Sequence, residues 1–224
     1  MIPIYETFYS WQGEGIHFGR SAFFIRTFGC PVHCTWCDSA GTWHPDYIPE
    51  KIQKKSAEEL VATAKQTNCD FVVVTGGEPA IHDLSLLTSL LKEQSIPCHI
   101  ETSGGFELKG DFQWVTLSPK REKLPLDETL KSADEIKVIV DGEGAIDEWH
   151  AYLNAHQVQI PIWLNIEWSQ RDNKKLKEQI TNFIKSEGTP YRVGYQFHKL
   201  FKADEMDSNS MAPVPLGGDL NLGY

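Results

Sequence analysis

The sequence predicts an α/β fold in which about six mostly parallel strands form a partial, open barrel. Short apolar runs rich in β-branched and aromatic residues alternate with helical patterns, which is typical of a parallel sheet with crossover helices. Six strands are too few to close an eight-stranded barrel. Turns with unusual chemistry follow four of the runs, and folds of this class bind ligands at the carboxyl ends of their strands.

The strands are predicted where apolar runs of four to eight residues are bounded by Gly, Pro, Ser or Asp. The first run contains two adjacent phenylalanines and ends at Gly29, which favours a buried strand. The predicted strands cover residues 21–28, 71–75, 98–102, 114–118, 135–140 and 162–166.

Four helices are predicted between these strands. The first begins at the capping box of Ser56, which is followed by apolar residues on one helical face. In residues 82–92, leucines recur at the i, i+3 and i+7 positions of a helix. The two remaining helices are predicted over residues 143–156 and 172–185.

Length and composition favour a single domain over residues 1–224, with an irregular, turn-rich tail at about 203–224. The formal net charge of −10 argues against a nucleic-acid-binding protein, which needs a basic face. No apolar run approaches the roughly 20 residues that cross a bilayer. The first residues lack the basic and apolar regions of a signal peptide, so we expect a cytoplasmic protein without membrane contact.

Three of the five cysteines form a C-x3-C-x2-C run at Cys30, Cys34 and Cys37. Three thiolates at this spacing can hold three corners of a cubane iron–sulfur cluster, which leaves the fourth iron open for a bound molecule. The alternative is a structural zinc site. Zinc needs a fourth ligand, and no second Cys/His pair follows the run, so the ligand count favours a cluster.

The cysteine run, with Trp36 before its last cysteine, resembles the cluster loop of the radical S-adenosylmethionine (radical SAM) enzymes. The segment Gly76-Gly77-Glu78-Pro79 after the second predicted strand resembles their S-adenosylmethionine-binding turn. The resemblance implies one 4Fe–4S cluster and S-adenosylmethionine, whose cleavage yields a deoxyadenosyl radical. The positions that the resemblance assigns to S-adenosylmethionine are Trp36, Cys37, Asp38, Gly77, Glu78, Ser118, Pro119, Lys120 and Asn165.

Within that superfamily, the chain resembles the 7-carboxy-7-deazaguanine synthases of queuosine biosynthesis over residues 4–201. The ordered set of motifs includes Trp11-Gln12-Gly13-Glu14-Gly15, Phe24-Ile25-Arg26, Ser118-Pro119-Lys120 and Gln196-Phe197-His198-Lys199. The family converts 6-carboxy-5,6,7,8-tetrahydropterin to 7-carboxy-7-deazaguanine by a radical ring contraction that releases ammonia, with Mg²⁺ assisting.

The resemblance also implies the substrate and magnesium positions. Ser39 matches a magnesium ligand, and the planar fork of Arg26 is suited to the substrate carboxylate. No side chain is assigned an acid–base catalytic role, because the radical abstracts the hydrogen atom. The substrate positions are Trp11, Gln12, Gly13, Glu14, Arg26, Thr75 and His198.

Two positions depart from the family pattern. Many relatives have Gln-Pro at the tip of the last strand where this chain has Asn165-Ile166-Glu167, and some end in a proline at the position of Asp204. Two other functions stay open at this point, a radical SAM activase acting on a partner protein and a non-catalytic metal-binding module. We also expect a homodimer through the exposed edge of an incomplete barrel, and a flavodoxin or ferredoxin as electron donor.

Overall fold

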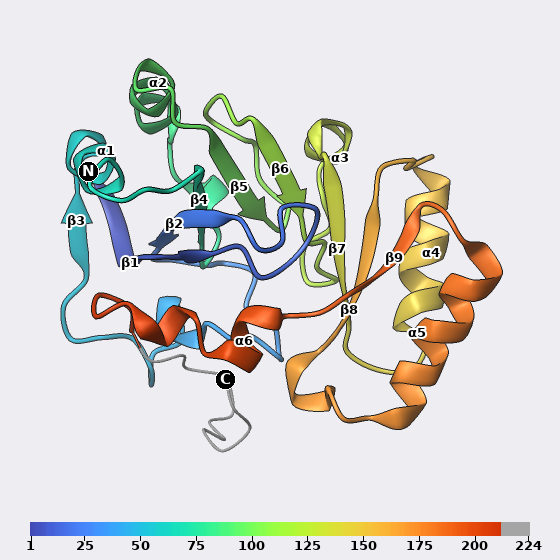
Figure 1. Cartoon of the computed structure of the whole chain (residues 1–224). Coiled ribbons are helices and arrows are strands. Elements are labelled where there is room, and N and C mark those ends of the chain that lie inside the picture. The colour runs from blue at the N-terminus through green and yellow to red at the C-terminus, as the bar shows by residue number, and fades with distance from the viewer. Residues whose placement is uncertain (212–224) are drawn as a thin grey trace.

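A single nine-stranded sheet forms the centre of the computed structural model, which describes residues 1–211. Its strand order is β3-β1-β2-β4-β5-β6-β7-β8-β9 (Figure 1). From β2 onward all neighbouring strands are parallel, whereas β1 is antiparallel to both β2 and β3. The strands are β1 (Ile2–Trp11), β2 (Ser21–Thr27), β3 (Gln53–Lys55), β4 (Phe71–Gly76), β5 (Cys98–Thr102), β6 (Trp114–Leu117), β7 (Glu135–Val140), β8 (Ile162–Ile166) and β9 (Tyr191–Gly194).

The predicted open α/β barrel is confirmed, and the six predicted strands are β2 and β4 to β8, each within one residue of its expected bounds. The strand count was too low, because β1, β3 and β9 were not predicted. The strands β3 and β9 have three and four residues, too few for a periodic pattern to stand out. In β1 the buried residues include Glu6 and Thr7, so the strand lacks alternation of apolar and polar residues.

The four predicted helices are confirmed with shifted starts. The helices are α1 (Ala57–Ala64), α2 (Ser85–Glu93), α3 (Asp127–Ser132), α4 (Ala145–Ala155), α5 (Lys174–Glu187) and α6 (Phe197–Phe201). Ser56 forms the expected capping box with Glu59. The helix predicted from residue 82 begins later because Pro79–Ile81 forms a separate 3-10 turn. The short helices α3 and α6 were not predicted.

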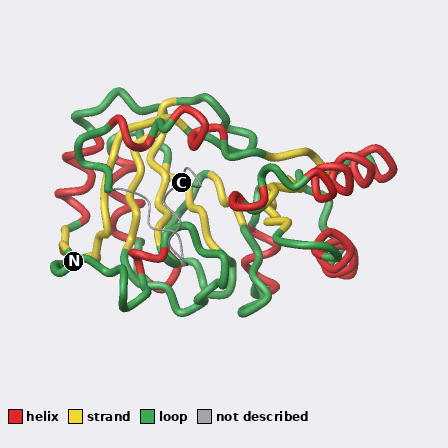
Figure 2. Tube along the Cα trace, turned by 90° about the horizontal axis from the view of Figure 1, so that it is seen from below, coloured by secondary structure: helices red, strands yellow, loops and turns green. Residues whose placement is uncertain are grey.

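Successive strand side chains point to opposite faces of the sheet, and the two faces differ. The large core lies between the sheet and its helices and includes Ile25, Val72, Val74 and Ile100. A smaller cluster on the other face contains Phe8, Ala22, Phe24, Phe71 and Val73. Figure 2 shows the strands in a row with helices near both ends of it.

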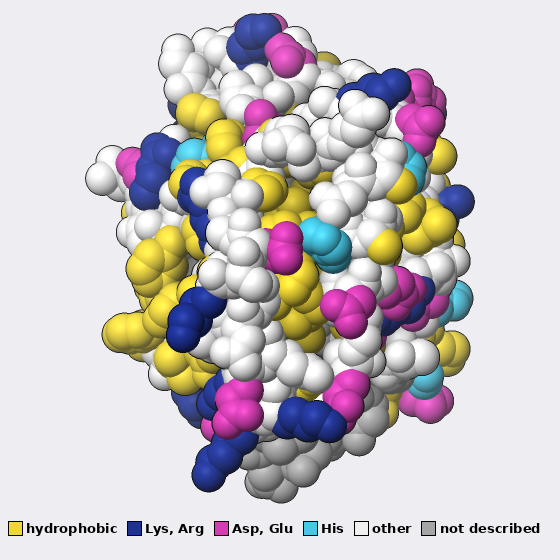
Figure 3. Space-filling model, turned by 90° about the vertical axis from the view of Figure 1, so that its right-hand side faces the viewer, with side chains coloured by type: hydrophobic (Ala, Val, Ile, Leu, Met, Phe, Trp, Pro, Cys, Tyr) yellow, Lys and Arg dark blue, Asp and Glu magenta, His cyan; other side chains and the backbone are white. Residues whose placement is uncertain are grey.

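The C-terminal part of the described chain crosses the open side of the sheet, where α6 lies in Figure 1. Residues 203–211 of the predicted irregular tail are turns and the 3-10 segment Asp204–Met206, and 212–224 lie outside the described residues. Figure 3 shows the end of the molecule with α4 and α5, where acidic and basic side chains intermingle. Among the described helices none has the length and apolar character needed to span a membrane.

Candidate active site

One cavity gathers the loops that follow the carboxyl ends of β2, β4, β5 and β6, together with part of β1. All predicted site residues except Pro119 and Asn165 line it. The lining residues among them are Trp11, Gln12, Gly13, Glu14, Arg26, Cys30, Cys34, Trp36, Cys37, Asp38, Ser39, Thr75, Gly77, Glu78, Ser118, Lys120 and His198. The motifs chosen from the sequence therefore meet at one place, and the ligand assigned to each residue remains a prediction.

Asn165 does not line this cavity but supports a residue that does. Its buried side-chain Nδ2 donates a hydrogen bond to Oε1 of Glu14 at 3.2 Å. A Cβ atom at Gly194 would meet Asn165 Oδ1 at 1.5 Å, so glycine on β9 makes room for this amide. Pro119 lies between Ser118 and Lys120, which both line the cavity.

The two loops that carry the cysteines and the Gly-Gly-Glu-Pro segment lie in direct backbone contact. The backbone N–H of Glu78 donates to the carbonyl of Gly29 at 2.9 Å. A Cβ atom at Gly77 would lie 2.3 Å from the Gly29 oxygen, so this approach requires glycine. The Trp43 indole Nε1 donates to Cys37 Sγ at 3.3 Å.

The Glu78 carboxylate is buried and organises the loop that follows β5. Its Oε1 accepts hydrogen bonds from Ala80 N at 3.0 Å and Thr102 Oγ1 at 2.6 Å. Its Oε2 accepts from the backbone N of Ser103 at 2.8 Å and from its hydroxyl at 2.5 Å. The carboxylate thus ties the turn after β4 to the end of β5.

An aromatic ring and an ammonium group form the wall beside the cysteine loop. The Trp36 indole donates to Asp141 Oδ2 at 2.8 Å, and Arg121 binds the same oxygen at 2.6 Å. Lys120 Nζ lies 5.4 Å from the Trp36 ring centroid and donates to the carbonyl and hydroxyl of Ser118. Burial lowers the pKa of Lys120. The fixed indole offers a flat face for stacking a purine.

At another part of the cavity wall, a lysine binds two carboxylates; we call this part the polar end of the cavity. Lys137 Nζ donates to Glu14 Oε2 at 2.5 Å and to Glu101 Oε2 at 3.3 Å. The Gln12 amide donates to Glu101 Oε1 at 2.9 Å and accepts from the backbone N of Glu14 at 3.1 Å. Burial alone lowers the pKa of Lys137, but attraction to the two carboxylates raises it above its ordinary value. This network holds Gln12 and Glu14 in fixed orientations.

Arg26 lies at the tip of β2, opposite Glu6 of β1 in the antiparallel register and beside Thr75 of β4 in the parallel one. Its Nε donates to Glu6 Oε1 at 2.6 Å. Burial alone lowers the pKa of the guanidinium, but attraction to Glu6 outweighs it and raises the pKa. Arg26 therefore stays positively charged inside the cavity.

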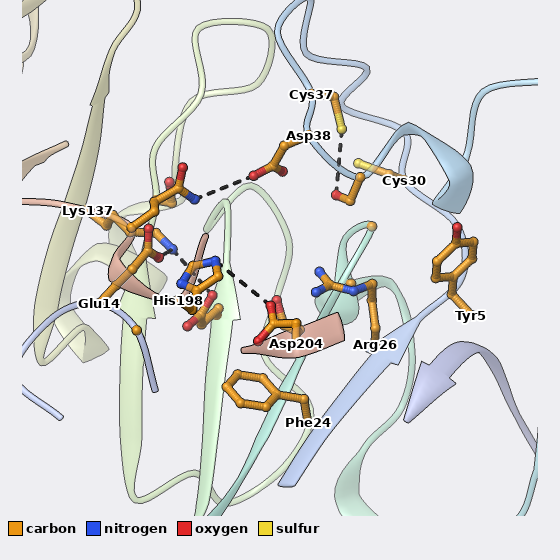
Figure 4. A pocket seen from close by; sticks show the side chains of 18 of the residues that line it. Tyr5, Glu14, Phe24, Arg26, Cys30, Cys37, Asp38, Lys137, His198 and Asp204 are labelled. Carbon is orange, nitrogen blue, oxygen red and sulfur yellow. Dashed lines mark hydrogen bonds and ion pairs between the residues drawn. The ribbon is translucent and has the colours of Figure 1, made fainter. Parts of the chain in front are cut away.

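An ion pair brings the C-terminal part of the chain to this cavity, with Lys199 Nζ 2.8 Å from Asp38 Oδ2. Within the C-terminal part, His198 Nε2 lies 3.9 Å from Asp204 Oδ2. Burial alone raises the pKa of Asp38, but Lys199 lowers it well below its usual value. In Figure 4 the cysteines lie above Arg26 and Asp204, and Lys137, Glu14 and His198 lie to one side.

Known proteins resemble this chain over most of its length. The radical SAM superfamily model matches residues 24–113. The chain is 42% identical over 199 residues to the 7-carboxy-7-deazaguanine synthase of Synechocystis sp., a match that covers 88% of this chain and 91% of that protein. The chain belongs to the 7-carboxy-7-deazaguanine synthase family. It is also 38% identical over 205 residues to the synthase of Flavobacterium psychrophilum, covering 89% and 91% of the two proteins.

A solved structure shares both fold and sequence with this synthase-family chain. The crystal structure of QueE from Escherichia coli superposes with a TM-score of 0.72 and 34% sequence identity, covering 88% of this chain and 94% of that chain. This family membership replaces the two other functions considered from the sequence, a protein activase and a non-catalytic metal-binding module.

Membership of the synthase family implies a 4Fe–4S cluster and S-adenosylmethionine, and the residues present fit them. Cys30, Cys34 and Cys37 are free thiols on one loop that line one cavity. Burial raises the pKa of the Cys34 thiol to about 12, so cluster binding must displace thiol protons there. In the described part of the chain, no three His, Cys, Asp or Glu side chains converge on one ion position. Cluster thiolates need no such convergence, because each binds a separate iron.

Several residues of this site were missed by the sequence reasoning. No role was assigned to Glu101, Lys137 or Glu6, nor to Lys199, although Lys199 lies in the family motif of residues 196–199. A signal for Glu101 and Lys137 existed, because both lie on predicted strands near residues already placed at the site. Glu6 gave no signal, because its strand was not predicted.

Proposed function

We propose that this protein converts 6-carboxy-5,6,7,8-tetrahydropterin to 7-carboxy-7-deazaguanine with release of ammonia, and thus acts as a carbon–nitrogen lyase of queuosine biosynthesis. The observation that carries this proposal is the cavity itself. It has three free cysteines at one side and, across from them, an arginine and a polar network that suit a carboxylated bicycle. The names and sequence identities of the relatives support the same reaction.

The polar end of the cavity supplies the contacts that such a substrate requires. The described hydrogen bond of Arg26 uses its Nε, which leaves both Nη groups available for a carboxylate. Gln12 and Glu14 offer an amide and a carboxylate to the mixed donors and acceptors of a pterin ring, and Lys137 fixes their positions. His198 and Thr75 lie at the same end and are assigned to the substrate in this proposal.

The cysteine side of the cavity would hold the cofactors. Cys30, Cys34 and Cys37 would bind the cluster, and Trp36 and Lys120 would contact S-adenosylmethionine. When bound, these two groups supply the deoxyadenosyl radical that abstracts a hydrogen atom from the substrate. The protein's own task is to hold the pterin in one orientation next to this wall and to keep water and other hydrogen donors away.

Mg²⁺, the assembly and the electron donor belong to this proposal as well. The hydroxyl of Ser39 lies 3.7 Å from Cys37 Sγ and offers a hard oxygen ligand between the cysteines and the polar end. The sheet ends at the edge strands β3 and β9, which supports a homodimer. Five free cysteines suit a reducing compartment such as the cytoplasm, and we propose a flavodoxin or ferredoxin as reductant and one catalytic domain.

Anaerobic reconstitution tests the proposed function. The loaded protein is expected to contain about four iron and four sulfide per chain. Given the carboxytetrahydropterin, S-adenosylmethionine, Mg²⁺ and a reductant, it should form 7-carboxy-7-deazaguanine, detected by mass. Cys30→Ala should form neither this product nor deoxyadenosine. A loaded wild-type protein that cleaves S-adenosylmethionine but leaves the pterin unchanged would refute the proposal.

A further inference from the structure

Glu6 is the neighbour that determines how Arg26 enters the cavity. The two residues are opposite each other in the β1–β2 register, and Glu6 Oε1 accepts from Arg26 Nε at 2.6 Å. The Glu6 side chain is 5% exposed, so this bond is shielded from water. A bond at Nε fixes the plane of the guanidinium, and among residues 1–211 its terminal nitrogens make no described hydrogen bond. In Figure 4 these nitrogens point toward Asp204, inside the cavity.

The second oxygen of Glu6 binds the C-terminal segment of the described chain. Glu6 Oε2 accepts from the backbone N–H of Met211 at 2.5 Å and from the Ser210 hydroxyl at 3.4 Å. Ser210 and Met211 both line the cavity. One carboxylate therefore joins the arginine of β2 to a segment almost two hundred residues further along the chain.

A second bond fixes this segment to the same strand. Asp207 Oδ2 accepts from the backbone N–H of Tyr9 at 2.8 Å, and its other oxygen accepts from the backbone of Asn209 at 2.8 Å. The carbonyl of Asp207 accepts from Ser210 N at 3.0 Å, which closes a turn. Asp207 thus holds the turn beside β1, so that the Met211 N–H is presented to Glu6.

These contacts affect the electrostatics around Arg26. A carboxylate next to Arg26 repels an incoming anion, and Glu6 is such a carboxylate. Hydrogen bonds donated by Met211 and Ser210 partly compensate the negative charge on Glu6 Oε2, because charge-assisted donors stabilise the oxygen that accepts them. Glu6 can then orient Arg26, and it weakens the attraction of Arg26 for a ligand anion less than a carboxylate without these hydrogen bonds would.

We propose that Glu6 is a positioning residue for Arg26 and that the segment 207–211 holds Glu6 in this role, so that the C-terminal segment sets the preference of the cavity for a carboxylated ligand. This inference rests on the proposed function, which supplies the carboxylate on the substrate.

Two variants break the link at different points. Arg26 Nε and Met211 N bind different oxygens of Glu6, and in Glu6→Gln one of these oxygens becomes an NH2 donor, so only one of the two contacts keeps its acceptor. Met211→Pro removes the backbone donor and leaves Glu6 unchanged. Ser208→Pro is the matched control. It places proline at the second position of the 207–210 turn, after an Asp207 that is already extended at φ −86° and ψ 127°. Among residues 1–211, the Ser208 N–H makes no described hydrogen bond.

The readout is the ratio of two dissociation constants. The cluster-loaded enzyme with S-adenosylmethionine is titrated with 6-carboxypterin and with pterin, which lacks the carboxylate. We expect Met211→Pro to lower the preference for 6-carboxypterin about tenfold, through weaker binding of that probe alone. Glu6→Gln should lower it to a similar extent, because the lost orientation of Arg26 outweighs the removal of a repelling charge, whereas Ser208→Pro keeps the wild-type ratio.

The outcomes separate this inference from the proposed function. A wild-type enzyme without preference for 6-carboxypterin, and without product in the reconstituted assay, would overturn the proposed function. If the wild-type enzyme prefers 6-carboxypterin and forms product, and the Glu6→Gln and Met211→Pro proteins keep the wild-type ratio of dissociation constants, the positioning role is overturned. Equal weakening of both probes would also overturn it, because a merely structural defect does not distinguish the carboxylate.

Discussion

Arg26 shows how a single charged residue can be held inside a cavity. Its guanidinium is largely removed from water, which by itself lowers its pKa, but attraction to Glu6 outweighs burial and raises the pKa. A buried cation that has used one of its five donors on a protein partner still has donors for a ligand. Arg26 is therefore best suited to binding an anion, and it has no reacting atom to contribute.

Replacing Arg26 by alanine should separate substrate binding from cofactor cleavage. We expect KM for the carboxytetrahydropterin to rise about 10- to 100-fold, which corresponds to the loss of charge-assisted hydrogen bonds. Slow formation of deoxyadenosine without product should continue, because the cysteine side of the cavity is unchanged. Steady-state kinetics with both products quantified provide the measurement.

Two further substitutions control this prediction. Arg26→Lys keeps the charge but loses the planar fork, so it should recover part of the affinity. Arg20→Ala removes an exposed arginine that pairs with Asp70 away from the cavity and should leave KM unchanged. Parallel loss of deoxyadenosine and product in Arg26→Ala would contradict the assignment.

The partner of Arg26 illustrates where the sequence reasoning stopped. Arg26 was placed at the site because it follows an apolar run and matches a family motif. Glu6 lies twenty residues earlier, and only the antiparallel β1–β2 register brings the two together. A long-range pair of this kind depends on which strands are neighbours, and local patterns do not contain that information.

At the scale of the elements, parallel strands explain why most of the predicted site residues line one cavity. Six strands with clear apolar runs were predicted within one residue, and their carboxyl ends necessarily share one edge of the sheet. The positions after these strands could therefore be grouped without knowledge of the structure. The antiparallel β1 and the segment 204–211 lie outside this rule, and both contribute walls that were not predicted.

Gly77 lies where the turn after β4 meets the cysteine loop. We predict that no side chain fits at this position. In Gly77→Ala the new methyl group would meet the Gly29 carbonyl and Cys30 Cβ, so the two loops must separate. We expect the free energy of unfolding to fall by about 1–3 kcal/mol. We also expect the iron bound per chain to fall to about half of the wild-type content or less. Urea unfolding and iron analysis provide the measurements.

Gly142 offers a matched control for this substitution. A Cβ atom there would have no neighbour within 4 Å, so Gly142→Ala should keep wild-type stability and iron content. If Gly77→Ala also kept both, the close approach of the two loops would not be required for cluster binding.

At the scale of the whole molecule, the stability of the fold is linked to pH through a buried histidine of β5. His99 of β5 stacks on Phe71 with 4.1 Å between ring centroids and lies beside His17 at 4.6 Å. Burial, followed by the charges of His17 and Arg20, lowers the pKa of His99 to about 3. The folded protein therefore keeps this ring neutral at pH values where an unfolded chain protonates it.

The free energy of unfolding should fall as the pH drops from 7.5 to 5.5. Below about pH 6.5 the unfolded state gains a proton at His99 that the folded state does not bind, which favours unfolding. His99→Phe keeps an aromatic ring in the stack and should remove about 1 kcal/mol of this pH dependence. Urea unfolding at the two pH values measures the difference. An identical pH dependence in both proteins would show that His99 binds no more protons in the unfolded state than in the folded state over this pH range.

The wall across from the cysteines is assembled from the two ends of the described chain, β1 and the segment 204–211. During translation, the cysteine loop and the turn after β4 leave the ribosome more than a hundred residues before His198 and Met211. The cavity can therefore be completed only after the cysteine loop is already outside the ribosome, when the last part of the described chain has been synthesised.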